Sequence, residues 1–125
     1  MSDSSQRPLD YGEIYPKVLR RLFPDSNDRK EAEKILSAYG TRSFHSEIQR
    51  VRTAILKVAG SNLEALSNQT ETACCDYRDA LCDAEYSNQS KSWGLRKRDP
   101  KKYQRIKEKD LKEHLEWIDE VTGSR

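Results

Sequence analysis

The sequence predicts an all-α fold, an antiparallel bundle of about five helices, on three observations. Apolar residues recur every three or four positions along most of the chain, whereas strand-like alternation is absent from the sequence. Glycine and proline stand between the periodic segments, where helices begin or end. Of the 125 residues, 34% are hydrophobic and 35% are charged, so we expect a thin core under a highly charged surface.

The first two helices are expected on either side of Pro24. Asp10, with Glu13 three residues later, is typical of a helix N-terminus because the aspartate side chain accepts a free backbone N–H. This helix is expected to run to Phe23, and Pro24 ends it. The second, over about residues 27–39, ends at Gly40, since glycine readily takes the left-handed conformation of a helix terminus.

The third and fourth helices are expected to form the centre of the bundle. Ser43 is the expected cap of the third, which runs to about residue 59 and carries its apolar stripe on Phe44, Ile48, Val51, Ile55 and Val58. Ser61 and Glu64 have the spacing of a capping box and predict a fourth helix over about residues 62–86.

A loop rich in small polar residues and charge is expected over residues 87–99. Asp99 and Pro100 then predict the start of the fifth helix, with aspartate at the cap and proline at the first helical position. This helix is expected to reach about Val121, before Gly123.

One helical domain is expected over residues 10–122, after a flexible leader over residues 1–9. The leader lacks the apolar segment of a secretory signal, and no apolar run in the sequence is long enough to cross a bilayer. Cys75 and Cys82 are too far apart on one helix to form a disulfide. Reduced cysteines suit a cytoplasmic protein.

Positive charge is concentrated in residues 91–112, which hold ten basic and three acidic residues, a net charge of +7 against −5 for the rest of the chain. Cations with interleaved aromatic residues are typical of a nucleic-acid or other polyanion site. The residues predicted to bind are Trp93, Arg96, Lys97, Arg98, Lys101, Lys102, Tyr103 and Arg105. The alternative is a solvated face, or docking of this segment on the acidic residues of 64–85.

Polar residues interrupt the apolar face of the fifth helix. Asp110 and His114 are i, i+4 neighbours, a spacing at which a carboxylate can orient an imidazole for acid–base catalysis. The alternative is a satisfied polar spot in the core. The sequence shows no nucleophile motif or phosphate-binding loop beside this pair.

Metal and cofactor signals are weak. The cysteines and histidines lack the short spacings of a zinc site, and the acidic row Asp76, Asp79 and Asp83 has no ligand-presenting loop. We therefore expect no metal and no cofactor.

Two sequence blocks resemble a group of small uncharacterised bacterial all-helical proteins. They are Arg50-Val51-Arg52 with Ala54-Ile55-Leu56-Lys57 and Gly60, and Asp76-Tyr77-Arg78-Asp79 with Ala84-Glu85-Tyr86. The resemblance covers about residues 35–86 and implies a bacterial origin and an all-helical fold, but no activity.

Charges on these two blocks also predict a structural network between the third and fourth helices. Arg52, or Arg50, is expected to pair with Asp76 or Asp79, with the Tyr77 hydroxyl in the same network.

The leading functional hypothesis is a non-enzymatic cytoplasmic protein-interaction module that associates with itself, since long amphipathic helices in a thinly apolar chain are often completed by a partner. Nucleic-acid binding through residues 91–112 is the alternative, and an enzyme built on Asp110 and His114 is the third. No membrane partner is expected.

Overall fold

The computed structural model describes residues 9–42 and 47–123, and all regular elements in these ranges are helices. They are α1 (Tyr11–Leu22), α2 (Ser26–Leu36), α3 (Ile48–Ala59), α4 (Leu63–Cys75), α5 (Tyr77–Glu85), α6 (Ser87–Ser90), α7 (Leu95–Arg98) and α8 (Pro100–Thr122). The predicted all-α class is therefore confirmed. Eight helices in the described ranges replace the expected five, and an antiparallel five-helix bundle is not confirmed.

The first and last helices begin where the capping signals predict. Asp10 accepts the backbone N–H of Glu13 at 3.3 Å, and Asp99 accepts that of Lys102 at 3.1 Å. The predicted cap Ser43, with Phe44 of the apolar stripe, lies outside the described residues.

The single helix expected over residues 62–86 is divided at Asp76 into α4 and α5. The Asp76 backbone is extended, with φ −154° and ψ 100°, and its side chain caps α5 by accepting the N–H of Arg78 at 3.0 Å. The expected Ser61–Glu64 capping box is wrong, because the side chain of Asn62 caps α4 instead. The loop expected over residues 87–99 contains α6 and α7.

Helix α3 lies at the centre of the core and packs against α1, α4 and α5. Its buried residues include Val51, Ile55 and Leu56, and the exposed fraction of each is 0%. Two buried hydroxyls, those of Thr53 and Thr70, donate to backbone carbonyls one turn earlier at 2.8 Å. Neither hydroxyl is therefore buried without a hydrogen-bond partner.

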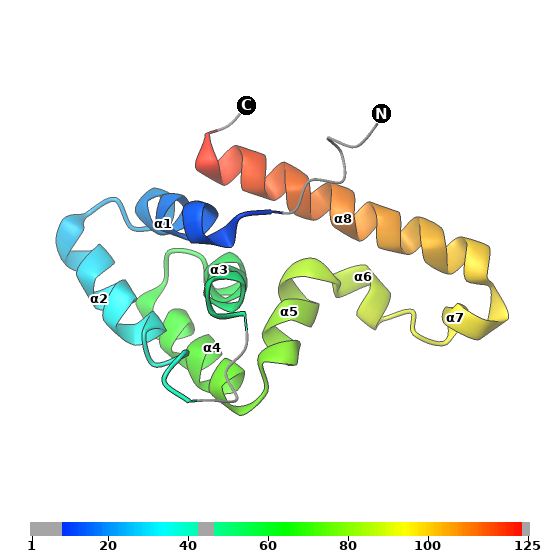
Figure 1. The fold of residues 1–125 in the computed structure, drawn as a ribbon, viewed down its shortest axis with the longest axis horizontal. Coiled ribbons are helices and arrows are strands. Elements are labelled where there is room, and N and C mark those ends of the chain that lie inside the picture. Colours follow the sequence, from blue (N-terminus) through cyan, green and yellow to red (C-terminus); the bar gives the residue numbers. More distant parts are fainter. Residues whose placement is uncertain (1–8, 43–46, 124–125) are drawn as a thin grey trace.

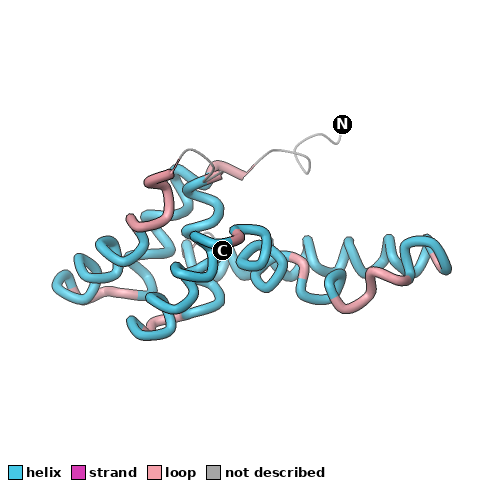
Figure 2. Tube along the Cα trace, turned by 90° about the horizontal axis from the view of Figure 1, so that it is seen from below, coloured by secondary structure: helices cyan, strands magenta, loops and turns pink. Residues whose placement is uncertain are grey.

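Helix α8 is shared between a body, which also comprises α1–α5, and an arm. Its C-terminal half lies beside α1, whereas its N-terminal half extends alongside α6 and α7 and away from α1–α4 (Figure 1). The view from below shows the same projection (Figure 2). We call residues 87–112, which comprise α6, α7 and the first half of α8, the arm.

Candidate functional site

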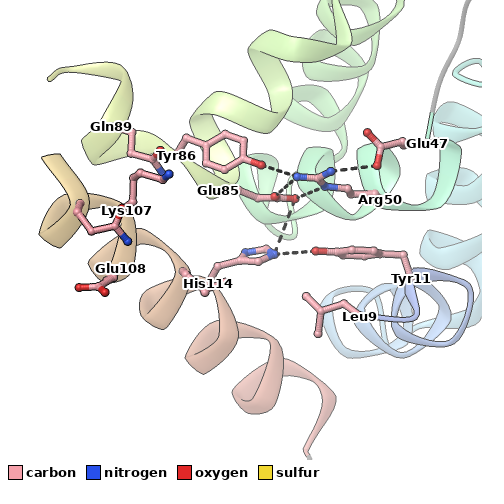
Figure 3. A pocket seen from close by; sticks show the side chains of 12 residues that line it. Leu9, Tyr11, Glu47, Arg50, Glu85, Tyr86, Gln89, Lys107, Glu108 and His114 are labelled. Carbon is pink, nitrogen blue, oxygen red and sulfur yellow. Dashed lines mark hydrogen bonds and ion pairs between the residues drawn. The ribbon is translucent and has the colours of Figure 1, made fainter. Parts of the chain in front are cut away.

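A cluster of charged side chains lies where α3 and α5 face the start of α1 (Figure 3). Arg50 makes a bidentate pair with Glu85, with Nε–Oε2 at 3.0 Å and Nη2–Oε1 at 2.6 Å. Arg50 Nη1 also donates to Glu47 at 2.9 Å, and Nη2 donates to the Tyr86 hydroxyl at 2.6 Å. Since two carboxylates hold one guanidinium, the cluster has a net charge of about −1. The hydrogen bonds to Glu85 raise the pKa of Arg50 further above its ordinary value.

His114 joins α8 to this cluster and to α1 and α3, and its Nε2 lies 3.8 Å from Glu85 Oε2. It is 4% exposed, and its Nδ1 lies 3.2 Å from Lys57 Nζ and its Nε2 3.0 Å from the Tyr11 hydroxyl. Because an ammonium group can only donate, Nδ1 is the acceptor, and the neutral ring carries its proton on Nε2. Burial lowers the pKa of His114 to about 4, so the imidazole is neutral at pH 7.

These side chains form part of the wall of a cavity of about 550 Å³. Helix α8 contributes Gln104, Lys107, Glu108 and Leu111 to the wall, and Leu9 lies at another side. Figure 3 shows Lys107 and Glu108 on the α8 side of the cavity, across from Arg50. The volume falls in the range of small-molecule sites.

No described hydrogen bond joins Asp110 to His114, so the carboxylate does not orient the imidazole. Both residues are buried, as expected if they are satisfied polar residues in the core. Asp110 accepts the backbone N–H of Asn88 at 3.2 Å and of Gln89 at 2.9 Å, and the Asn88 side-chain amide at 2.9 Å. The carboxylate therefore holds α6 against α8, whereas His114 holds α8 against α1 and α3. A neutral imidazole with both nitrogens engaged is poorly suited to acid–base chemistry at pH 7.

All ten basic residues of the segment 91–112 are exposed, including Arg96, Lys97 and Arg98 on α7. The described ion pairs include one of the ten, Lys109 with Glu113 at 4.0 Å on the same helix. Within the described ranges, no ion pair joins this segment to the acidic residues of 64–85. The structure therefore favours a solvent-facing cationic surface over internal docking.

Five of these cations share one side of α8. At about 100° per residue they fall within an arc of about 100°, opposite the buried Tyr103 and Asp110. We call these five residues the cation row: Lys101, Lys102, Arg105, Lys109 and Lys112.

The two aromatic residues predicted to stack on bases differ in exposure. Tyr103 is 8% exposed, and its hydroxyl donates to Gln89 at 3.4 Å, so it packs α8 against α6 and offers no free ring face. Trp93 is 46% exposed, but the Arg96 guanidinium lies 5.2 Å from its ring centroid. The arm therefore presents charge to solvent more than it presents a stacking platform.

The predicted network of Arg52, Asp76, Tyr77 and Asp79 is not formed by the described hydrogen bonds and ion pairs. Arg52 donates to the Tyr39 carbonyl at 2.8 and 3.1 Å, which ties α3 to the end of the α2 segment. Asp76 pairs with its near neighbour Arg78, and Tyr77 packs against the core. The interhelical pair of α3 is made by Arg50 instead.

Sequence reasoning did not predict the roles of Glu85, Lys57 and Tyr11. A signal was present for Glu85, because it follows the buried Leu81 by four residues and so shares its helix face. A carboxylate at that position needs a cationic partner from a neighbouring helix. No comparable spacing marks Tyr11, which meets His114 across 103 residues of sequence.

Comparison of the chain with family models, with curated proteins and with solved structures gave no match. In the described ranges, no helix combines the length and apolar character that a bilayer crossing requires. The cysteines Cys74, Cys75 and Cys82 are free thiols, and no described group of three or more His, Cys, Asp or Glu side chains is arranged to hold a metal ion. The cation row and the cavity are therefore the features of the described structure that bear on function.

Proposed function

We propose that the protein is a non-enzymatic cytoplasmic binding module whose arm binds the phosphate backbone of a nucleic acid. The observation that carries the proposal is the cation row, five exposed lysine and arginine side chains on one side of a projecting helix. All five side chains of the row are exposed on the projecting part of α8, so a long polyanion has access to them.

The dimensions of the row suit an extended polyanion. Lys101 and Lys112 are eleven residues apart, a rise of about 17 Å along α8. Duplex DNA carries one charge per about 1.7 Å of its axis, so the row lies opposite on the order of ten phosphate charges. Such contacts fix position without reading sequence.

A charge-matched pair of variants tests this proposal. The first replaces Lys101, Lys102, Arg105 and Lys109 by glutamine. The control replaces Arg20, Arg21, Lys30 and Lys34, which are exposed on the body, by glutamine. Both variants lose the same formal charge, so a difference between them reports the position of the charge.

Binding is measured by fluorescence anisotropy with labelled single-stranded and duplex oligonucleotides over a range of salt concentrations. Because each lost phosphate contact lowers the salt slope by about 0.7 to 0.9, we expect the row variant to lose up to about 3 units of slope. The control should keep its slope. Equal weakening of both variants, or no binding by the unmodified protein at low salt, would contradict the proposal.

Self-association is the second candidate, favoured by the exposure of two large apolar residues on the arm. Leu111 is 57% exposed and Trp93 is 46% exposed. Light scattering at tens of micromolar protein tests this candidate, and a strict monomer would rule it out.

A further inference from the structure

The cavity and the cation row meet on the same helix. At about 100° per residue, the exposed α8 residues that line the cavity occupy the sector between the row and the buried His114; they are Gln104, Lys107, Glu108 and Leu111. Glu108 is about 20° from the line of Lys101, and Lys107 belongs both to the basic segment and to the cavity wall. A strand that follows the row therefore passes the mouth of the cavity. We propose that this cavity binds an unpaired nucleobase of a strand held by the row, an inference that rests on the proposed function.

Charge favours a base over a phosphate inside the cavity. The guanidinium of Arg50 is already held by Glu85 and Glu47, so the inner wall has one carboxylate in excess. At the α8 side, Lys107 and Glu108 offset one another. Lys57, behind His114, also interacts with Glu85 and reduces this excess. A phosphate would still meet no unpaired cation on the described inner wall, whereas a neutral heterocycle requires none.

Unused hydrogen-bonding groups on the inner wall suit the edge of a base. The Tyr86 hydroxyl accepts from Arg50, which leaves its proton to donate. Gln89 is 7% exposed, and its side-chain carbonyl accepts from Tyr103, while its amide nitrogen has no partner among the described hydrogen bonds. Donors of this kind match ring nitrogen and carbonyl acceptors.

The remaining wall supplies the other contacts that a base requires. The carboxylate of Glu108 is an acceptor for an exocyclic amino group. Tyr11 and Tyr86 add aromatic side chains to the wall, and Leu111 adds an apolar one. Single-stranded nucleic acid is commonly bound by this combination of a basic track and aromatic side chains.

The test compares three probes on the full-length protein: a short labelled single strand, the same strand with its central bases removed but its sugar–phosphate backbone intact, and the corresponding duplex. If a base enters the cavity, the intact strand should bind about tenfold more tightly than the strand lacking bases. A factor of this size matches the binding energy that one base stacked on an aromatic side chain contributes. A fluorescent base analogue at the central position should change its emission on binding.

A cavity-filling variant separates this effect from the fold. Leu111→Trp places a large ring at the mouth from a position that is already exposed, and Val58→Trp is the control, an exposed residue outside the cavity wall. We expect Leu111→Trp to abolish the preference for the intact strand and to leave the salt slope unchanged. Val58→Trp should change neither quantity.

Two failures are distinguishable in this experiment. If all three probes bind equally tightly and Leu111→Trp has no effect, the base-binding inference is overturned while backbone binding by the row stands. If none of the three probes binds at low salt, the proposed function fails, and the base-binding inference fails with it.

Discussion

Replacing Glu85 by glutamine tests whether the Arg50–Glu85 pair stabilises the fold. Glu85 is 8% exposed and receives two charge-assisted hydrogen bonds from Arg50. Each such bond contributes about 1.5–3 kcal/mol. The amide keeps one acceptor oxygen but turns an NH₂ group toward a guanidinium donor. The Arg50 side chain is 24% exposed and keeps Glu47 and Tyr86, so the cost should lie below the limit for a fully buried pair.

We therefore expect Glu85→Gln to lower the free energy of unfolding by about 2–3 kcal/mol, which corresponds to a fall in Tm of roughly 10 °C for a chain of this length. Urea denaturation monitored by circular dichroism measures the change. The matched control is Glu113→Gln. Its ion pair with Lys109 is 4.0 Å long, both side chains are more than half exposed, and glutamine keeps an oxygen that can accept the exposed 3.3 Å hydrogen bond from Asn88. The substitution should therefore cost less than about 0.5 kcal/mol.

A double-mutant cycle with Arg50→Met isolates the pair. The two single substitutions should be non-additive by about 1–2 kcal/mol, because the second removes a partner that the first has already lost. A Glu85→Gln cost equal to that of the exposed control, or additive single effects, would show that the pair contributes nothing and refute the reasoning.

Three further predictions concern other buried residues, two on α8 and one on α4. The pKa of His114 is lowered from 6.5 to about 4, so protonation favours the unfolded chain at acidic pH. The contribution of the neutral imidazole to the free energy of unfolding is therefore complete above pH 6.5, and on the order of 3 kcal/mol is lost as the pH falls toward 4. His114→Gln should flatten that part of the urea-stability profile, and an unchanged profile would contradict the assignment. Asp110→Ala should speed hydrogen exchange of the α6 amides and leave that of α3 unchanged, whereas equal acceleration in both would mean that the arm does not open separately. Leu66→Ala, at a fully buried site, should cost about 2–5 kcal/mol, against less than about 0.5 kcal/mol for the same substitution at the exposed Leu111.

The sequence predicted those features that depend on short spacings. The all-α class, the caps at Asp10 and Asp99 and the central position of α3 follow from apolar periodicity and from side chains that bond within three residues. The break at Asp76 was missed because the apolar pattern continues through it, from Ala73 to Leu81. Its cap is visible in the sequence only if an aspartate inside a periodic segment is considered as a helix start.

The candidate site was less predictable, since its contacts join distant parts of the chain. The burial of Asp110 and His114 follows from their position in an apolar arc, but their partners do not. The i, i+4 spacing that suggested a pair is also compatible with two buried residues that face different neighbours. Tertiary packing decides between these arrangements, and no local signal carries that information.

The separate partners of Asp110 and His114 explain how the arm is positioned. The two residues are one turn apart on α8, and both are almost fully buried. Asp110 fixes α6 to α8, and His114 fixes α8 to the body through Tyr11 and Lys57. Because polar contacts of this kind have few alternative geometries, a single turn sets the direction in which the rest of α8 leaves the body. The cation row and the mouth of the cavity lie on the outer sides of that same stretch of helix, so their relative positions depend on these two buried side chains.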